Sequence, residues 1–390
     1  MKATSRTLSL ALLAALASPA HADIMIDVIN GSEVSLQGLF QSDINYFDND
    51  LVDLNGADTN DGKNQEFELR RAEVILLGKG VTFDWQLGYD AKANKFLDTF
   101  VRYKMGTAFL QAGQYKQFNS LEELTSTRHN DFISKAMVTN LFGVARRVGV
   151  SYGVEEASYG YTFGLFGREL TRNLAHGGGY GGRAYWAPIN DIGKVLHLGI
   201  SAVDFDTDAD TLRLRVRPDA DLATARLIDT GTFLNADRQR TFGLEAAYID
   251  GPFKLQGEFM RSEVDRYATR STSQPGASFT GDSWYVYGLW NITGETWTYK
   301  AGLPVTPYGT ETASGMWQLT ARYDSTDLTD EPVFGGDEQN ITVGVNWYWR
   351  ANFKFMVNYV KVNSDKFNRT LGREISDDPS ILEARAQFYW

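Results

Sequence analysis

Residues 381–390, ILEARAQFYW, close the chain and decide the fold. The even-numbered residues from Leu382 to Trp390 are all apolar, whereas Glu383, Arg385 and Gln387 are polar. Successive side chains of a strand point to opposite faces, so these two sets occupy opposite sides. Ten alternating residues match the length and pattern of a strand that crosses a membrane at a tilt. A half-buried strand of a soluble sandwich would leave the terminal aromatic unexplained.

The same alternation recurs along the chain, for example at 196–202, 253–259, 341–347 and 353–359. We predict about sixteen strands, with centres near 38, 71, 86, 100, 110, 149, 162, 183, 199, 242, 257, 286, 319, 343, 356 and 386. Short connections (78–80, 250–252, 348–351) alternate with long polar ones (44–64, 115–144, 206–237, 265–281, 363–380). Short periplasmic turns and long outer loops are typical of bacterial barrels. The pattern predicts an all-β, transmembrane, antiparallel β-barrel, in which 292–314 is an unusually long periplasmic connection.

The N-terminus predicts export. Lys2 and Arg6 precede an apolar run from Leu8 to Ala17, and Ala20-His21-Ala22 gives a small-x-small cleavage site. This is the pattern of a signal peptide over 1–22, and the run is too short to span a bilayer. Residues 23–390 then form one barrel domain, expected in the outer membrane of a Gram-negative bacterium.

Composition excludes several classes of function. The chain has 38 basic and 49 acidic residues, a net charge of -11, whereas nucleic-acid binders are usually basic. It has no cysteine, so no disulfide framework supports the fold. His129, His176 and His197 are far apart, without a metal-ligand or nucleophile–base spacing, so we expect no cofactor, no metal and no enzyme activity.

The strongest local signal for chemistry is Arg213, Arg215 and Arg217, which alternate with apolar residues. In an extended segment the three guanidinium groups lie on one side, about 7 Å apart. Each can bind phosphate or carboxylate through two donors. A row of such groups offers successive weak anion sites, as conduction requires. The alternative is an outer hairpin whose arginines bind lipopolysaccharide phosphates.

Two arginine pairs lie on predicted strands, Arg70-Arg71 and Arg146-Arg147. Neighbours on a regular strand point to opposite faces, so we expect at most one of each pair inside. Val148 shares the face of Arg146, which favours Arg147 as the inward residue and Arg146 near the rim. A lipid-facing arginine at mid-membrane would cost roughly 2–4 kcal/mol, so one member of the first pair should lie near an interface.

A series of motifs resembles the phosphate-selective porin O and P family of trimeric outer-membrane channels. In order, the motifs are 68–72 (ELRRA), 113–116 (GQYK), 120–126 (SLEELTS), 146–150 (RRVGV), 213–218 (RLRVRP), 293–295 (TGE) and 321–323 (ARY). The resemblance implies a homotrimer of about 16-stranded barrels. It also implies that the third loop, 115–144, folds into each lumen and that the arginines of 206–237 lie on the pore wall.

In that loop, Ser120 and Glu123 have capping-box spacing, which makes Glu123 a candidate cap residue. The resemblance implies a lysine of the phosphate constriction at the position of Glu123, and a carboxylate there would repel phosphate. Lys135 stands where the family usually has arginine. Asp98 matches a family aspartate near the constriction, although an ordinary solvated loop residue is the alternative.

Arg70, Arg71, Lys116, Arg128, Lys135, Arg147, Arg213, Arg215 and Arg217 are therefore the candidate anion path, and Glu123 and Asp98 the candidate acidic residues at the constriction. The expected function is passive diffusion of small anions, namely phosphate, polyphosphate or others, in contact with outer-membrane lipid and lipopolysaccharide. A weakly selective general porin is the first alternative, and a barrel enzyme or adhesin the second.

Overall fold

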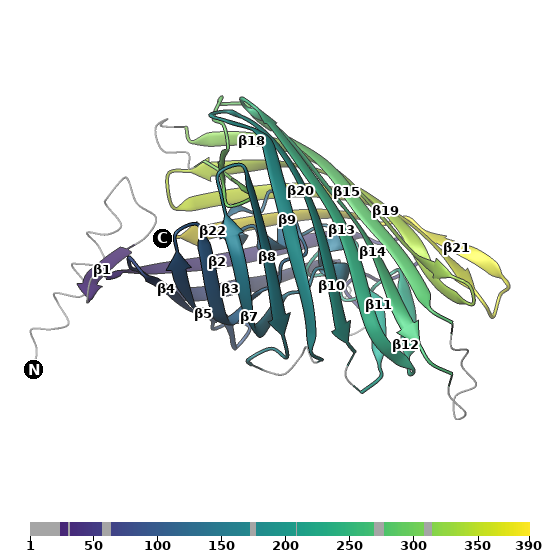
Figure 1. Ribbon diagram of the computed structural model, residues 1–390. Coiled ribbons are helices and arrows are strands. Elements are labelled where there is room, and N and C mark those ends of the chain that lie inside the picture. Colours follow the sequence, from purple (N-terminus) through teal and green to yellow (C-terminus); the bar gives the residue numbers. More distant parts are fainter. Residues whose placement is uncertain are drawn as a thin grey trace, which may run out of the picture.

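The computed structural model describes residues 24–29, 32–56, 64–171, 177–207, 209–268, 277–307 and 314–390. The predicted signal peptide, 1–22, and His176 lie outside these residues. Sixteen strands close into one antiparallel barrel (Figure 1). They are β2 (Ser32–Asp48), β3 (Gln65–Lys79), β4 (Phe83–Asp90), β5 (Lys95–Met105), β6 (Ala108–Lys116), β7 (Arg146–Glu155), β8 (Tyr159–Phe166), β9 (Gly179–Asp191), β10 (Lys194–Asp206), β13 (Ala236–Asp250), β14 (Phe253–Arg266), β15 (Phe279–Asn291), β18 (Met316–Asp330), β19 (Val333–Trp349), β20 (Phe353–Asn368) and β22 (Ser380–Tyr389).

Each strand pairs with its neighbour in the chain, and β22 closes the barrel against β2 with Leu39 opposite Tyr389 and Asp48 opposite Ser380. All sixteen predicted centres fall within these strands. Two short strands extend the barrel edges: β1 (Ile24–Ile29) pairs with β2, and β21 (Arg373–Asp377) with β20. Figure 1 places β1 and the C-terminus at one end and β21 at the other.

The barrel buries its polar faces and exposes its apolar ones. On β22, Leu382 is 48% exposed, whereas Glu383, Arg385 and Gln387 are at most 3% exposed. Val343 and Val357 on β19 and β20 are likewise exposed. This arrangement is the reverse of a soluble protein and suits an outer surface in contact with lipid.

The connections carry further elements. The β6–β7 connection contains α2 (Leu121–Leu124), the 3-10 helix η1 (Thr127–His129) and α3 (Met137–Phe142). The β10–β13 connection contains the hairpin β11 (Leu212–Arg215) and β12 (Asp229–Phe233). The predicted long connection after β15 contains the hairpin β16 (Thr298–Lys300) and β17 (Leu303–Val305). Among the described residues, no helix is long and apolar enough to cross a membrane.

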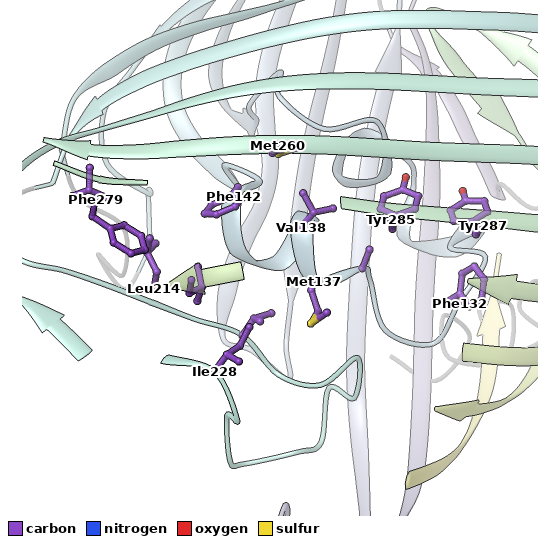
Figure 2. Packing of buried hydrophobic residues seen from close by; sticks show 14 of the residues in the cluster. Phe132, Met137, Val138, Phe142, Leu214, Ile228, Met260, Phe279, Tyr285 and Tyr287 are labelled. Carbon is purple, nitrogen blue, oxygen red and sulfur yellow. The ribbon is translucent and has the colours of Figure 1, made fainter. Parts of the chain in front are cut away.

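One buried apolar cluster joins these connections to the barrel wall. In Figure 2, Phe132, Met137, Val138 and Phe142 of the β6–β7 connection and Leu214 and Ile228 of the β10–β13 connection lie among side chains from the wall. Those wall residues are Met260 on β14 and Phe279, Tyr285 and Tyr287 on β15. The two connections are thus packed against the inward faces of the strands.

Candidate functional site

Residues 117–145 connect β6 to β7 but bond to strands distant from both. Asn358 on β20 accepts the backbone N–H of Ile133 at 2.9 Å, and Arg385 on β22 donates to the Ile133 carbonyl at 2.7 Å. Lys254 on β14 forms a buried ion pair with Asp131 at 2.6 Å. A buried charge is tolerated only with a partner, so these contacts fix the path of the segment.

The helix α2 begins after Ser120, which supplies one half of the predicted capping box, whereas the Glu123 carboxylate is ion-paired with Lys135. The Ser120 hydroxyl accepts the backbone N–H of Glu123 at 3.1 Å. Glu258 on β14 accepts the N–H groups of Leu121 at 2.9 Å and Glu122 at 2.7 Å. A strand carboxylate therefore satisfies the free donors of the first helical turn.

Glu123 lies between two lysines. Its carboxylate is ion-paired with Lys135 and lies 4.0 Å from the Lys116 ammonium, which also donates to the Glu123 carbonyl at 2.6 Å. Burial alone would raise the pKa of Glu123, but the charges of Lys135 and Lys116 outweigh it and lower the pKa to about 2. The Glu123 carboxylate is therefore ionised.

A cavity of about 480 Å³ lies between the β6–β7 connection and the inner faces of β2 to β6. Arg102, Lys116, Arg128 and Arg146 are its basic lining residues. Arg128 donates to the Gln37 amide oxygen at 2.6 Å.

Asp98, predicted near the constriction, is part of this cavity and is ion-paired with Arg146 at 2.6 Å. Arg146, the first residue of β7, lines the same cavity, so the prediction that only Arg147 of this pair lies inside is wrong: at the strand end Arg146 turns to the Asp98 carboxylate. Arg147 is buried, at 8% exposure, but is not among the residues that line this cavity.

The first arginine pair departs from the prediction. The register between β2 and β3 is irregular at this point. Arg71 pairs with Gln41 and Leu69 pairs with Ser42, so Arg70 has no partner residue on β2 in the ladder. This β-bulge lets both arginines point inward. Arg71 bonds to Glu73 at 3.3 Å, and Arg70 is ion-paired with Asp221 at 3.0 Å. The expectation of opposite faces is wrong here because it assumed a regular strand.

The predicted arginine row lies on β11 and just after it. Leu214 and Val216 are buried in the apolar cluster, so the alternating arginines point away from it. Arg213 is ion-paired with Asp229, Arg215 is exposed, and Arg217 donates to the Ala223 carbonyl at 2.6 Å.

Burial lowers the pKa of Arg217; Asp221 opposes this shift, while the charge of Arg70 adds to it. Asp221 of the same connection is ion-paired with Arg70 at 3.0 Å, so the end of the arginine row lies near the arginine pair on β3.

The family model for phosphate-selective porin O and P matches residues 40–390. The chain belongs to this family. A relative named Porin O, from Pseudomonas aeruginosa, is 25% identical over 94% of this chain and 92% of its own length. A protein of Caulobacter vibrioides is 32% identical over 73% of this chain, which spans only 59% of that relative.

Solved structures agree with the fold. OmpT, an outer membrane protein of Vibrio cholerae, superposes with a TM-score of 0.60 at 11% identity, over 94% of this chain and 99% of that one. The anion-selective porin from Comamonas acidovorans gives 0.57 at 12% identity, over 92% and 100%. These likenesses concern the fold alone. Membership of the family makes the chain a porin of the Gram-negative outer membrane.

Sequence reasoning missed two parts of this site. Arg102 was not singled out, although it lies on the polar face of β5 between Val101 and Tyr103, which are exposed on the outside. The hairpin β16–β17 was treated as a plain connection, yet Leu303, Pro304 and Val305 line the same cavity. Alternation could have indicated the first residue, but no local signal shows where the hairpin folds.

Proposed function

We propose that this porin conducts small anions, phosphate and polyphosphate among them, by passive diffusion. The observation that carries the proposal is that basic side chains from three separate segments are linked inside the barrel. Arg217 interacts electrostatically with Arg70, and Arg71 bonds to Glu73. Glu73 lines the cavity that holds Lys116 and Arg128. Arg213, Arg215 and Arg217 belong to the β10–β13 connection, Arg70 and Arg71 to β3, and Lys116, Arg128 and Lys135 to the β6–β7 region. In this proposal the β6–β7 connection folds into the lumen and forms the constriction.

The partners of these basic groups suit conduction better than tight binding. Four of these groups already have a carboxylate partner, namely Arg70, Arg71, Arg213 and Lys135. An incoming anion must therefore compete with a carboxylate of the protein. Conduction needs sites that are weak and multiple enough for the ion to leave. Glu123 is one of these resident carboxylates: it pairs with Lys135 and lies near Lys116, so an anion that approaches either lysine competes with it.

The direct test is the reversal potential of the purified porin in a KCl gradient across a planar bilayer. Anion preference is expected, and a cation-preferring value would remove the proposal. Added phosphate should reduce the chloride current if phosphate occupies the same sites. Absence of phosphate block together with anion preference would favour the second candidate, a weakly selective porin, which the many oppositely charged pairs also favour.

We also propose, from the family, that three copies assemble into a trimer and that the outer rim contacts lipid and lipopolysaccharide. Native mass spectrometry of the porin extracted in mild detergent should give three chains per particle. A monomer that conducts as well as the extracted protein would contradict the trimer without affecting the anion path.

A further inference from the structure

The hairpin β16–β17 is held against the inner wall by buried polar contacts. The hydroxyl of Tyr299 bonds to Nδ1 of His197 on β10 at 2.7 Å, and Arg183 on β9 donates to the Gly302 carbonyl at 2.8 Å. Trp297, just before the hairpin, is 1% exposed within the apolar cluster. Buried bonds of this kind fix an orientation because each lost partner leaves an unsatisfied group.

The turn of the hairpin requires glycine. Gly302 has a φ of +75°, and a Cβ at this position would come within 2.6 Å of the ring of Tyr185. Only glycine tolerates both the backbone conformation and the contact. The turn therefore sits tightly on β9, and its three following residues face the cavity.

Those residues add apolar surface to the cavity. Leu303, Pro304 and Val305 line it together with Leu124 and Phe118 of the β6–β7 connection. Phe100 on β5 adds an aromatic ring, packed edge-on against Tyr115 with ring centres 6.4 Å apart. These apolar groups share the cavity with the four basic residues described above.

A small inorganic anion gains little from such a lining. Its hydration shell must be replaced by hydrogen bonds, and aliphatic side chains offer none. An organic anion can place its carboxylate at the basic residues and bury its apolar part against the hairpin. The cavity thus offers contacts to both parts of one such solute, although Glu73 and Asp98 also line it.

We propose that this cavity selects monocarboxylates that carry an aromatic or other apolar group over anions of the same charge without one. The inference rests on the proposed anion conduction and adds the class of solute. The hairpin supplies the discrimination, and the basic residues supply the attraction common to all anions.

The test compares anions of equal charge in the intact porin in planar bilayers. Bi-ionic potentials of the wild-type porin should give a higher permeability ratio to chloride for benzoate than for gluconate, a fully hydroxylated carboxylate. The Leu303→Ser/Val305→Ser double variant should lower the benzoate-to-chloride ratio by about threefold or more, since it removes apolar contact area. Ile192→Ser, in a turn between β9 and β10 where Ile192 is fully exposed, is the matched control and should keep the wild-type ratio.

Equal ratios for benzoate and gluconate in the wild-type porin would overturn the inference, and this comparison depends on no variant. A benzoate ratio that the double variant leaves unchanged, with its barrel assembled and conducting, would overturn it as well. Failure of the proposed function itself is separate, because it appears as cation preference in the KCl gradient.

Discussion

Substitution of Arg215 best distinguishes the two hypotheses for the arginine row, a pore-wall segment and a surface hairpin. It is exposed on the side of β11 that faces away from the apolar cluster. We expect Arg215→Ala to lower the anion-to-cation permeability ratio about twofold in 1 M KCl, where charges act over only about 3 Å. Reversal potentials measure the ratio. Arg373→Ala, which removes an exposed arginine on β21, is the control, and equal effects of both changes would favour the surface hairpin.

Because two lysines neutralise its charge, Glu123 should repel anions only weakly. Its removal should still change the anion-to-cation permeability ratio. Glu123→Gln leaves Lys116 and Lys135 without their carboxylate, so we expect the anion-to-cation permeability ratio to rise about twofold. Glu33→Gln, at an exposed site of β2, should leave the ratio as it is. An unchanged ratio would contradict this expectation and would mean that Glu123 acts only on the local structure of the connection.

The pH dependence of that effect follows from the depressed pKa of about 2. Ionised Glu123 stabilises the folded segment at every pH above its unfolded value of 4.5, and this contribution is lost as the pH falls through about 2. Glu123→Gln should therefore change the reversal potential equally at about pH 7 and about pH 4. An effect that is much smaller at the lower pH would mean an ordinary carboxyl pKa.

At the scale of the element, the bulge in β3 makes one residue dispensable. Arg70 is the extra residue of the strand, so its deletion should restore a regular ladder and keep every other side chain on its face. Deleting Val74 in the same strand should instead move part of the strand to the wrong face. Heat-modifiable mobility on gels reports barrel assembly, which we expect for the first deletion and not for the second. Loss of assembly in both would show that Arg70 itself is needed.

The anchors of the β6–β7 connection should contribute to stability. Lys254→Met leaves Asp131 buried with Tyr287 as a donor but without its cation. Breaking a buried pair in this way typically costs about 3–5 kcal/mol, so the urea midpoint followed by tryptophan fluorescence should fall. Lys361→Met, at an exposed lysine of β20, should change the free energy of unfolding by no more than about 0.5 kcal/mol. Equal midpoints would mean that the connection is held without this pair.

The strands could be predicted from the sequence, whereas the contacts between distant segments could not. Period-two alternation located all sixteen strands because lipid outside and water-facing groups inside impose it on every crossing. It also put Arg385 and Lys354 on the inner face. It could not show that Arg385 binds the Ile133 carbonyl or that Lys354 binds the Asn130 carbonyl, because those partners are more than 200 residues away. The bulge at Arg70 and the hairpin β16–β17 were missed for the same reason, since both depend on neighbours in space.

Acidic and basic side chains are distributed differently along the barrel axis. The chain is acidic, at -11, yet the proposed anion path is basic. Many exposed carboxylates lie at the end with the long loops, which is the outer end of such barrels. They include Asp48, Asp50, Asp53, Asp206, Asp237, Asp327, Glu331, Glu374 and Asp378. Arg240, Arg261, Arg369 and Arg373 are exposed at the same end and offset part of this charge, so we expect the rim to repel anions only on balance before they reach the basic interior.

This separation predicts an unusual salt dependence. At about 0.01 M salt the field of the rim extends roughly 30 Å, whereas at about 0.1 M it extends roughly 10 Å. Raising the salt at a fixed ratio across the bilayer should thus increase the anion preference, because screening removes the repulsion of the rim before the closer attraction inside. Glu331→Gln/Glu374→Gln should raise the preference mainly at low salt, whereas Asp191→Asn, at an exposed site on the opposite end, should not. A preference that only falls with added salt would mean that the interior charges act alone and that the rim has no part in selection.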